Sequence, residues 1–129
     1  MKSAGSISFI LALVLCRFSP AYTQYTLQDR DVRVENGWIE SCSYSFANKS
    51  IIIPDSLDGQ VVIGVGKYNE GSGVFSWKGI TDIQLPPTLQ YIGPQVFAGN
   101  SLMEVDFSKC RDLRSIGSGA FSANELMVL

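Results

Sequence analysis

The sequence predicts a β-rich repeat solenoid, in which short strands of successive units stack on one another and little helix forms. Two observations support this fold class. Apolar residues recur at a nearly constant period, which is 22 residues from Ile80 to Leu102 and 24 residues from Leu102 to Leu126. Glycine, phenylalanine and asparagine recur at fixed offsets within that period. Periods of this length are typical of stacked repeats, because one unit cannot bury its apolar face alone.

The first half of each unit is expected to carry a strand. Residues 80–85 align with residues 102–107 and with residues 126–129, apolar position on apolar position. Ile83 and Leu85 are two positions apart, so both point to the same face of an extended chain. That face is the predicted core side.

The second half of each unit repeats an Ile-Gly pair, a phenylalanine and an asparagine, because residues 89–100 align with residues 113–124. The glycines precede a turn and predict backbone angles that a Cβ atom would penalise. The phenylalanines are predicted to fill each layer, and the asparagines to bond neighbouring backbone at a tight turn. The predicted structural positions are Ile80, Ile83, Leu85, Leu89, Ile92, Gly93, Phe97, Asn100, Leu102, Val105, Phe107, Leu113, Ile116, Gly117, Phe121 and Asn124.

An earlier unit is degenerate and carries a five-residue insertion around residues 68–73. Trp38 lies before it, in a lead-in that is expected to cap the first layer. The predicted divisions are a signal peptide at 1–23, a cap at 24–50 and a solenoid at 51–129, with units at about 51–79, 80–101 and 102–125 and a partial unit at 126–129.

The first 23 residues have the pattern of a secretory signal peptide. Lys2 precedes an apolar run over residues 7–16, and a more polar segment follows. The run is shorter than the roughly 20 apolar residues that a transmembrane helix needs. Cleavage is predicted after Thr23, with cleavage after Ala21 as the alternative.

A lipid anchor on Cys16 is disfavoured, because Leu15 stands where a small residue should precede the cysteine. Removal of residues 1–23 from the 129 leaves 106 residues and takes away Lys2 and Arg17, so the formal charge moves from −2 to −4. A mildly acidic domain without a Lys/Arg cluster argues against nucleic-acid binding.

Neither an enzyme nor a bound cofactor or metal is expected. The chain has no histidine, which removes the commonest general base and the commonest zinc ligand. The Gly64–Lys67 stretch lacks the first glycine and the Ser or Thr of a phosphate-binding loop. Cys42 and Cys110 are expected at opposite ends of an elongated stack, too far apart for a disulfide.

The motif Ile80-x-x-Ile83-x-Leu85-Pro86, followed by Leu89-x-x-Ile92-Gly93-x-x-x-Phe97, closely resembles the BspA-like class of leucine-rich repeats of bacterial surface and secreted proteins. The resemblance covers about residues 50–129. It implies a leucine-rich-repeat solenoid, a right-handed superhelix of the α/β-horseshoe type with short strands. It also implies adhesion to host or bacterial proteins, and it implies no catalytic residues.

Two sets of outward residues are candidate partner-binding positions. Asp82 with Glu104, and Gln84 with Asp106, fall in matching columns on the outward face of successive units. The alternative interpretation is a solvated face that charge keeps soluble.

Tyr68 and Trp77 flank the insertion and form the second set, because insertions in solenoids map to loops on one side. The expected function is non-catalytic binding of an extracellular or surface protein. The alternative is an accessory or truncated module of a larger secreted enzyme or glycan-handling system. An uncapped strand at residues 126–129 predicts self-association at that edge.

Overall fold

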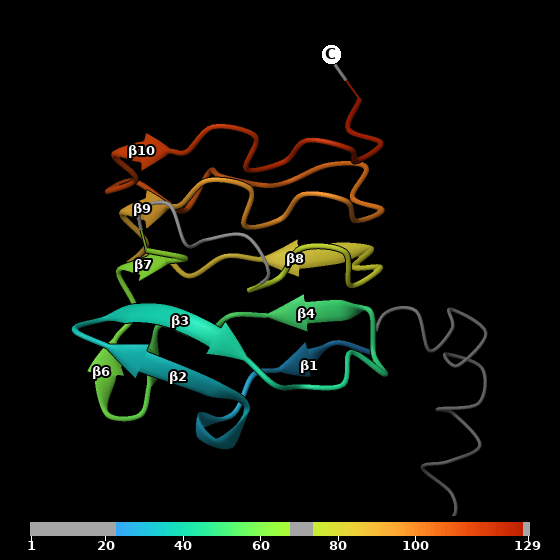
Figure 1. The fold of residues 1–129 in the computed structure, drawn as a ribbon. Coiled ribbons are helices and arrows are strands. Elements are labelled where there is room, and N and C mark those ends of the chain that lie inside the picture. The colour runs from blue at the N-terminus through green and yellow to red at the C-terminus, as the bar shows by residue number, and fades with distance from the viewer. Residues whose placement is uncertain (1–22, 68–73, 128–129) are drawn as a thin grey trace, which may run out of the picture.

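The computed structural model describes residues 23–67 and 74–127 (Figure 1). Residues 1–22 of the predicted signal peptide, Tyr68 and the last two residues of the predicted partial unit therefore lie outside the described residues. Within the described part the chain is rich in short strands, and its helical structure is the 3-10 helix η2 (Asp29–Asp31). The strands are β1 (Tyr25–Thr26), β2 (Val32–Glu35), β3 (Trp38–Cys42), β4 (Ser50–Ile52), β5 (Ser56–Leu57), β6 (Gln60–Val61), β7 (Gly64–Val65), β8 (Asp82–Gln84), β9 (Tyr91–Ile92) and β10 (Ser115–Ile116).

Eight of these strands form two sheets that run side by side along the molecule. The first sheet has the order β1-β4-β8, and the second has the order β10-β9-β7-β3-β2. All neighbours in both sheets are parallel except β2 and β3. Strands β4 and β8 of the first sheet are followed along the chain by β7 and β9 of the second, so these two coils contribute one strand to each sheet. The coil of β10 contributes a strand to the second sheet alone. The coils stack from the N-terminal end at the bottom of Figure 1 to the C-terminal end at the top.

The predicted β-rich repeat fold with little helix is confirmed. One predicted strand is wrong, because residues 102–107 form no regular strand although the alignment with β8 predicts one. The Asp106 carboxylate accepts the Ser108 amide at 2.8 Å, a local turn that competes with extended backbone. The segment still stacks on β8's coil, since the Ser101 amide donates to the Ile80 carbonyl at 2.8 Å.

The N-terminal segment joins both sheets rather than lying apart from them. Its strand β1 pairs with β4, Tyr25 opposite Ile51, and its strand β3 pairs with β7. Strand β2 folds back on β3 through Asn36 and Gly37, whose φ angles of 52° and 81° suit the tight turn of a hairpin. The hairpin covers the N-terminal edge of the second sheet with an antiparallel strand.

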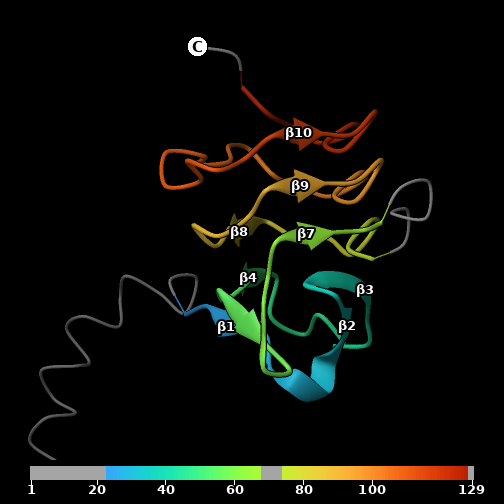
Figure 2. The ribbon, with the colours of Figure 1, turned by 90° about the vertical axis from the view of Figure 1, so that its left-hand side faces the viewer.

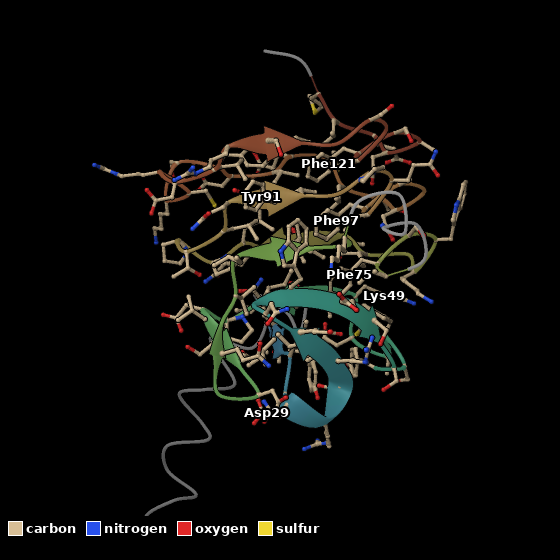
Figure 3. The ribbon with its side chains drawn as sticks, turned by 60° about the vertical axis from the view of Figure 1, so that its left-hand side comes forward. Asp29, Lys49, Phe75, Tyr91, Phe97 and Phe121 are labelled. Carbon is tan, nitrogen blue, oxygen red and sulfur yellow. The ribbon has the colours of Figure 1, made fainter. Side chains whose placement is uncertain are left out.

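The core lies between the two sheets and contains a ladder of phenylalanine rings. Phe97 stacks on Phe75 with ring centroids 5.4 Å apart, and on Phe121 with centroids 5.3 Å apart. Figure 3 shows the three rings one above another across successive coils. Phe75 and Phe97 are fully buried, whereas Phe121 is half-buried. The predicted layer-filling role therefore extends back to Phe75 in the degenerate unit.

The last coil is much more exposed than the coils before it. Ile92 is 1 % exposed, but its counterpart Ile116 is 47 % exposed. Burial is thus incomplete for several positions that the repeat pattern assigns to the core: Val105, Phe107, Leu113, Ile116 and Phe121. Val105, Phe107, Leu113 and Phe121 still pack against the core, but no later coil in the described residues covers their other side, so their burial stays incomplete.

The Ile-Gly glycines are required for a different reason from the one predicted. Gly66 has a φ of 69°, but neither Gly93 nor Gly117 adopts a left-handed backbone. Instead a Cβ atom on Gly93 would collide with the Gly66 carbonyl oxygen, and one on Gly117 would lie 2.5 Å from the Pro94 nitrogen. Successive coils approach too closely at this corner to admit a side chain.

Candidate functional site

Four of the six predicted binding residues gather on one surface. Asp82 and Gln84 are exposed on β8 and flank the buried Ile83. Together with the exposed Glu104 and Asp106 of the next coil they line an open depression of about 500 Å³. Gln24 and Lys109 complete its rim. The side-chain alternation of one short strand and the stacking of the next coil bring these residues together.

The acidic depression, defined by Asp82, Gln84, Glu104, Asp106 and Lys109, is negatively charged. Its lining holds three carboxylates and one lysine. Hydrogen bonds from the side chain and the backbone of Ser108 hold the pKa of Asp106 below its ordinary value, so this carboxylate is ionised at neutral pH. The Asp82 carboxylate accepts the Thr81 hydroxyl at 3.1 Å. The surface therefore suits a cationic ligand.

Trp77 is not part of the acidic depression. Its side chain is 73 % exposed, and its backbone has a φ of 58°. It lies two residues after Phe75, between β7 and β8. Its indole covers the backbone of Gly99 in the next coil, where a Cβ atom would come within 2.2 Å of the ring. The sixth predicted residue, Tyr68, lies outside the described residues.

A second surface was not predicted from the sequence. Trp38, in the predicted cap, stacks its indole on Tyr91, with ring centroids 5.3 Å apart and ring planes 12° apart. The register explains the pairing: Trp38 is opposite Gly64, and Gly64 is opposite Tyr91. Because Gly64 has no side chain, the two rings lean over it and meet. Figure 2 shows β7 and β9 stacked on the face that carries these residues.

A signal for this pair is present in the sequence. Strands β3, β7, β9 and β10 of the second sheet each place one residue immediately before a branched aliphatic one, in the pairs Trp38-Ile39, Gly64-Val65, Tyr91-Ile92 and Ser115-Ile116. These first residues form an outward column, here called the aromatic column. Alignment of Ile39 in the lead-in with Val65, Ile92 and Ile116 of the later units would have placed Trp38 and Tyr91 in the same column.

A groove of about 500 Å³ lies beside the aromatic column. Trp38, Tyr91 and Ser115 contribute side chains, and Gly93 and Gly117 contribute backbone. None of its lining residues is charged. The two surfaces therefore differ in chemistry, since one is acidic and the other is aromatic and neutral.

The cysteines do not provide an activated nucleophile. Cys42 and Cys110 are free thiols in the described part of the chain. Burial raises the pKa of the Cys110 thiol, and the nearby Asp106 carboxylate adds to this effect. Burial likewise raises the pKa of Cys42. Both thiols are therefore protonated at neutral pH, and the thiol is the unreactive form.

Among residues 23–67 and 74–127, no group of three or more acidic or cysteine side chains is arranged to hold a metal ion. No helix in those same ranges is long and apolar enough to cross a membrane.

Comparison with known families identifies the repeat. The model of the BspA type leucine rich repeat region (6 copies) matches residues 69–128, just under half of the chain. No curated protein and no solved structure matches the sequence. The family match covers the coils that carry β8, β9 and β10 and all five residues that define the acidic depression.

Proposed function

Residues 69–128 belong to the BspA-type leucine-rich repeat family, and from this premise we propose that the chain is a non-catalytic binding module that recognises a partner protein. The family is generally non-catalytic and suggests repeat-based protein binding. We further propose that the stacked coils form a solenoid, whose regular outward positions serve as the recognition surface.

One observation carries this proposal, namely that four outward residues from two coils share one open, acidic surface. Asp82, Glu104 and Asp106 give it a surplus of negative charge. Complementary charge steers association and gives specificity at such surfaces. The partner is therefore proposed to present a lysine- or arginine-rich segment to the acidic depression.

The place of action is proposed to be outside the cell or at its surface. Proteins with this repeat are typically surface or secreted proteins in bacteria. The charged start and short apolar run within residues 1–23 support export by a cleaved signal peptide. N-terminal sequencing of the exported protein should begin at Gln24, and a start at Met1 would contradict the proposal.

The binding proposal is tested with a short peptide of alternating lysine and serine as the probe. The native chain should bind it saturably, more weakly as salt rises, and should not bind the peptide in which glutamate replaces lysine. The double variant Asp82→Asn/Glu104→Gln should bind roughly two- to thirtyfold more weakly, since each exposed charge pair contributes about 0.2–1 kcal/mol.

The matched control is Asp58→Asn/Glu125→Gln, which removes the same charge from exposed positions outside the depression. Asn tolerates the φ of 53° at residue 58. This control should bind the lysine peptide as the native chain does. An equal loss in both double variants would show that net charge alone attracts the peptide, and the acidic depression would be rejected as the binding surface.

A further inference from the structure

Within residues 23–67 and 74–127, no ring stacks on one face of the Tyr91 ring. On one side Tyr91 stacks on Trp38 across Gly64. On the other side its parallel partner in the aromatic column is Ser115, which is exposed and has a small side chain. The groove beside the column extends from Trp38 past Tyr91 to Ser115 and Gly117. The aromatic column thus contains the rings of Trp38 and Tyr91, and the small side chain of Ser115 leaves space beside Tyr91 for a further ring.

The polar side chains of the groove are suited to donate hydrogen bonds to a neutral ligand. Tyr91 and Ser115 contribute hydroxyl groups, each of which can donate a hydrogen bond. The lining has neither a carboxylate nor a side-chain amide. A suitable ligand is therefore uncharged, carries a compact apolar ring, and offers carbonyl oxygens as acceptors.

We propose that this groove binds a proline-rich segment of a partner protein in the polyproline II conformation. Such a segment combines apolar pyrrolidine rings with backbone carbonyls that have no internal partners. It is also pre-ordered, and aromatic-lined grooves are its usual receptors. One proline ring stacks on the open face of Tyr91. The inference rests on the proposed protein-binding function and assigns a partner class to a surface distinct from the acidic depression.

A glycan is the other ligand that aromatic rings commonly bind, and the lining disfavours it. Sugar hydroxyls both donate and accept, so they pair best with side chains that accept strongly, such as carboxylates and amides. The groove has neither. The Tyr91 and Ser115 hydroxyls alone would leave most hydroxyls of a sugar ring without a protein partner.

The test uses a capped oligoproline peptide and, as its control, a capped glycine–serine peptide of the same length. The chain has two tryptophans, so Trp77→Phe makes Trp38 the single fluorescent reporter. Because Trp38 stacks on Tyr91, a ring placed on the other face of Tyr91 should change its emission. A saturable change with oligoproline and none with the glycine–serine peptide is expected.

Two variants in the Trp77→Phe background localise the site. Tyr91→Ala should weaken oligoproline binding about thirtyfold, as removal of an aromatic anchor does. Because this change also removes the Trp38 contact, Ser115→Phe provides a second variant that leaves both rings in place. Its new ring should occupy the space above Tyr91 and weaken binding to a similar degree. The matched control, Ser118→Phe, adds the same ring at an exposed position outside the groove and should bind normally.

Unchanged oligoproline binding in Ser115→Phe would overturn the proposal, as would the absence of saturable binding to the native chain. A saturable response of Trp38 to a cello-oligosaccharide instead of oligoproline would overturn it in favour of a glycan site. Asp82→Asn/Glu104→Gln should bind oligoproline normally. Failure of this groove is therefore distinguishable from failure of the acidic depression, which the lysine peptide measures separately.

Discussion

At the scale of single residues, Asn100 joins two coils through one buried side chain. It is 6 % exposed. Its Oδ1 accepts the amides of Lys78 and Ile80, each at 3.0 Å, and its Nδ2 donates to the carbonyls of Phe75 and Phe97, each at 2.9 Å. Loss of the Asn100 side chain would therefore remove four hydrogen bonds to the backbone at once. As predicted, the asparagine bonds to backbone at its own turn, through Phe97. It also bonds to the backbone of the preceding coil, through Phe75, Lys78 and Ile80.

Asn100→Ala should lower the free energy of unfolding by about 3 kcal/mol or more, because each buried polar group left unsatisfied costs about 1–3 kcal/mol. Asn124 makes the corresponding bonds to Leu102 and Phe97 from a half-buried position. Asn124→Ala should therefore cost less, since water can replace its bonds. Urea denaturation of both variants tests this order, and equal losses would contradict it.

At the scale of strands, the spacing of β7 and β9 is set at the glycine corner. The Gly93 amide donates to the Val65 carbonyl at 2.8 Å. In that position a Cβ atom on residue 93 would collide with the Gly66 carbonyl oxygen, which belongs to the backbone and cannot rotate away. A side chain at residue 93 would therefore force the two coils apart and break the bond that joins them.

Gly93→Ala should destabilise the chain by about 3 kcal/mol or more, or prevent folding, as overpacking at a rigid contact does. The matched control is Gly59→Ala, at a φ of 69° with open space around the added methyl group. Its expected cost is only the backbone strain of about 1–2 kcal/mol. Thermal unfolding followed by circular dichroism compares the two, and a smaller loss for Gly93→Ala would refute the steric explanation.

At the scale of the whole molecule, the two ends of the described stack differ. The N-terminal edge of the second sheet is covered by the antiparallel strand β2. The opposite edge is β10, where Ile116 is 47 % exposed. Met103 and Met127, at 55 % and 66 % exposure, add further apolar surface on the last coil. An exposed edge strand with apolar neighbours is a template for association.

Residues 24–129 should therefore self-associate in a concentration-dependent way in size-exclusion chromatography with light scattering. Ile116→Lys should shift the population toward the monomer, because a charged lysine on an edge strand opposes pairing. Ser101→Lys adds the same charge at an exposed site outside the strand and should leave the distribution unchanged. A native chain that stays monomeric at every concentration would contradict the prediction.

The sequence by itself determined the period, the β-rich repeat fold and the buried character of positions such as Ile80, Leu89 and Ile92. These properties follow from local alternation of side chains and from the recurrence of one unit, both of which are visible along the chain. It also predicted the outward positions Asp82 and Glu104, because strand alternation fixes which residues face away from a core.

Only the tertiary structure decided what depends on one coil touching another. The Trp38–Tyr91 stack joins residues far apart in sequence, and it exists because the register places Gly64 between them. Likewise, Gly93 is required by the Gly66 carbonyl of the coil beneath, which no local backbone preference reveals. Exposure of Ile116 is set by its place in the last described coil. The strand register, the distance between neighbouring coils and the place of a coil in the stack all depend on contacts between distant parts of the chain. The same repeat motif can therefore occur with different registers, distances and places in the stack.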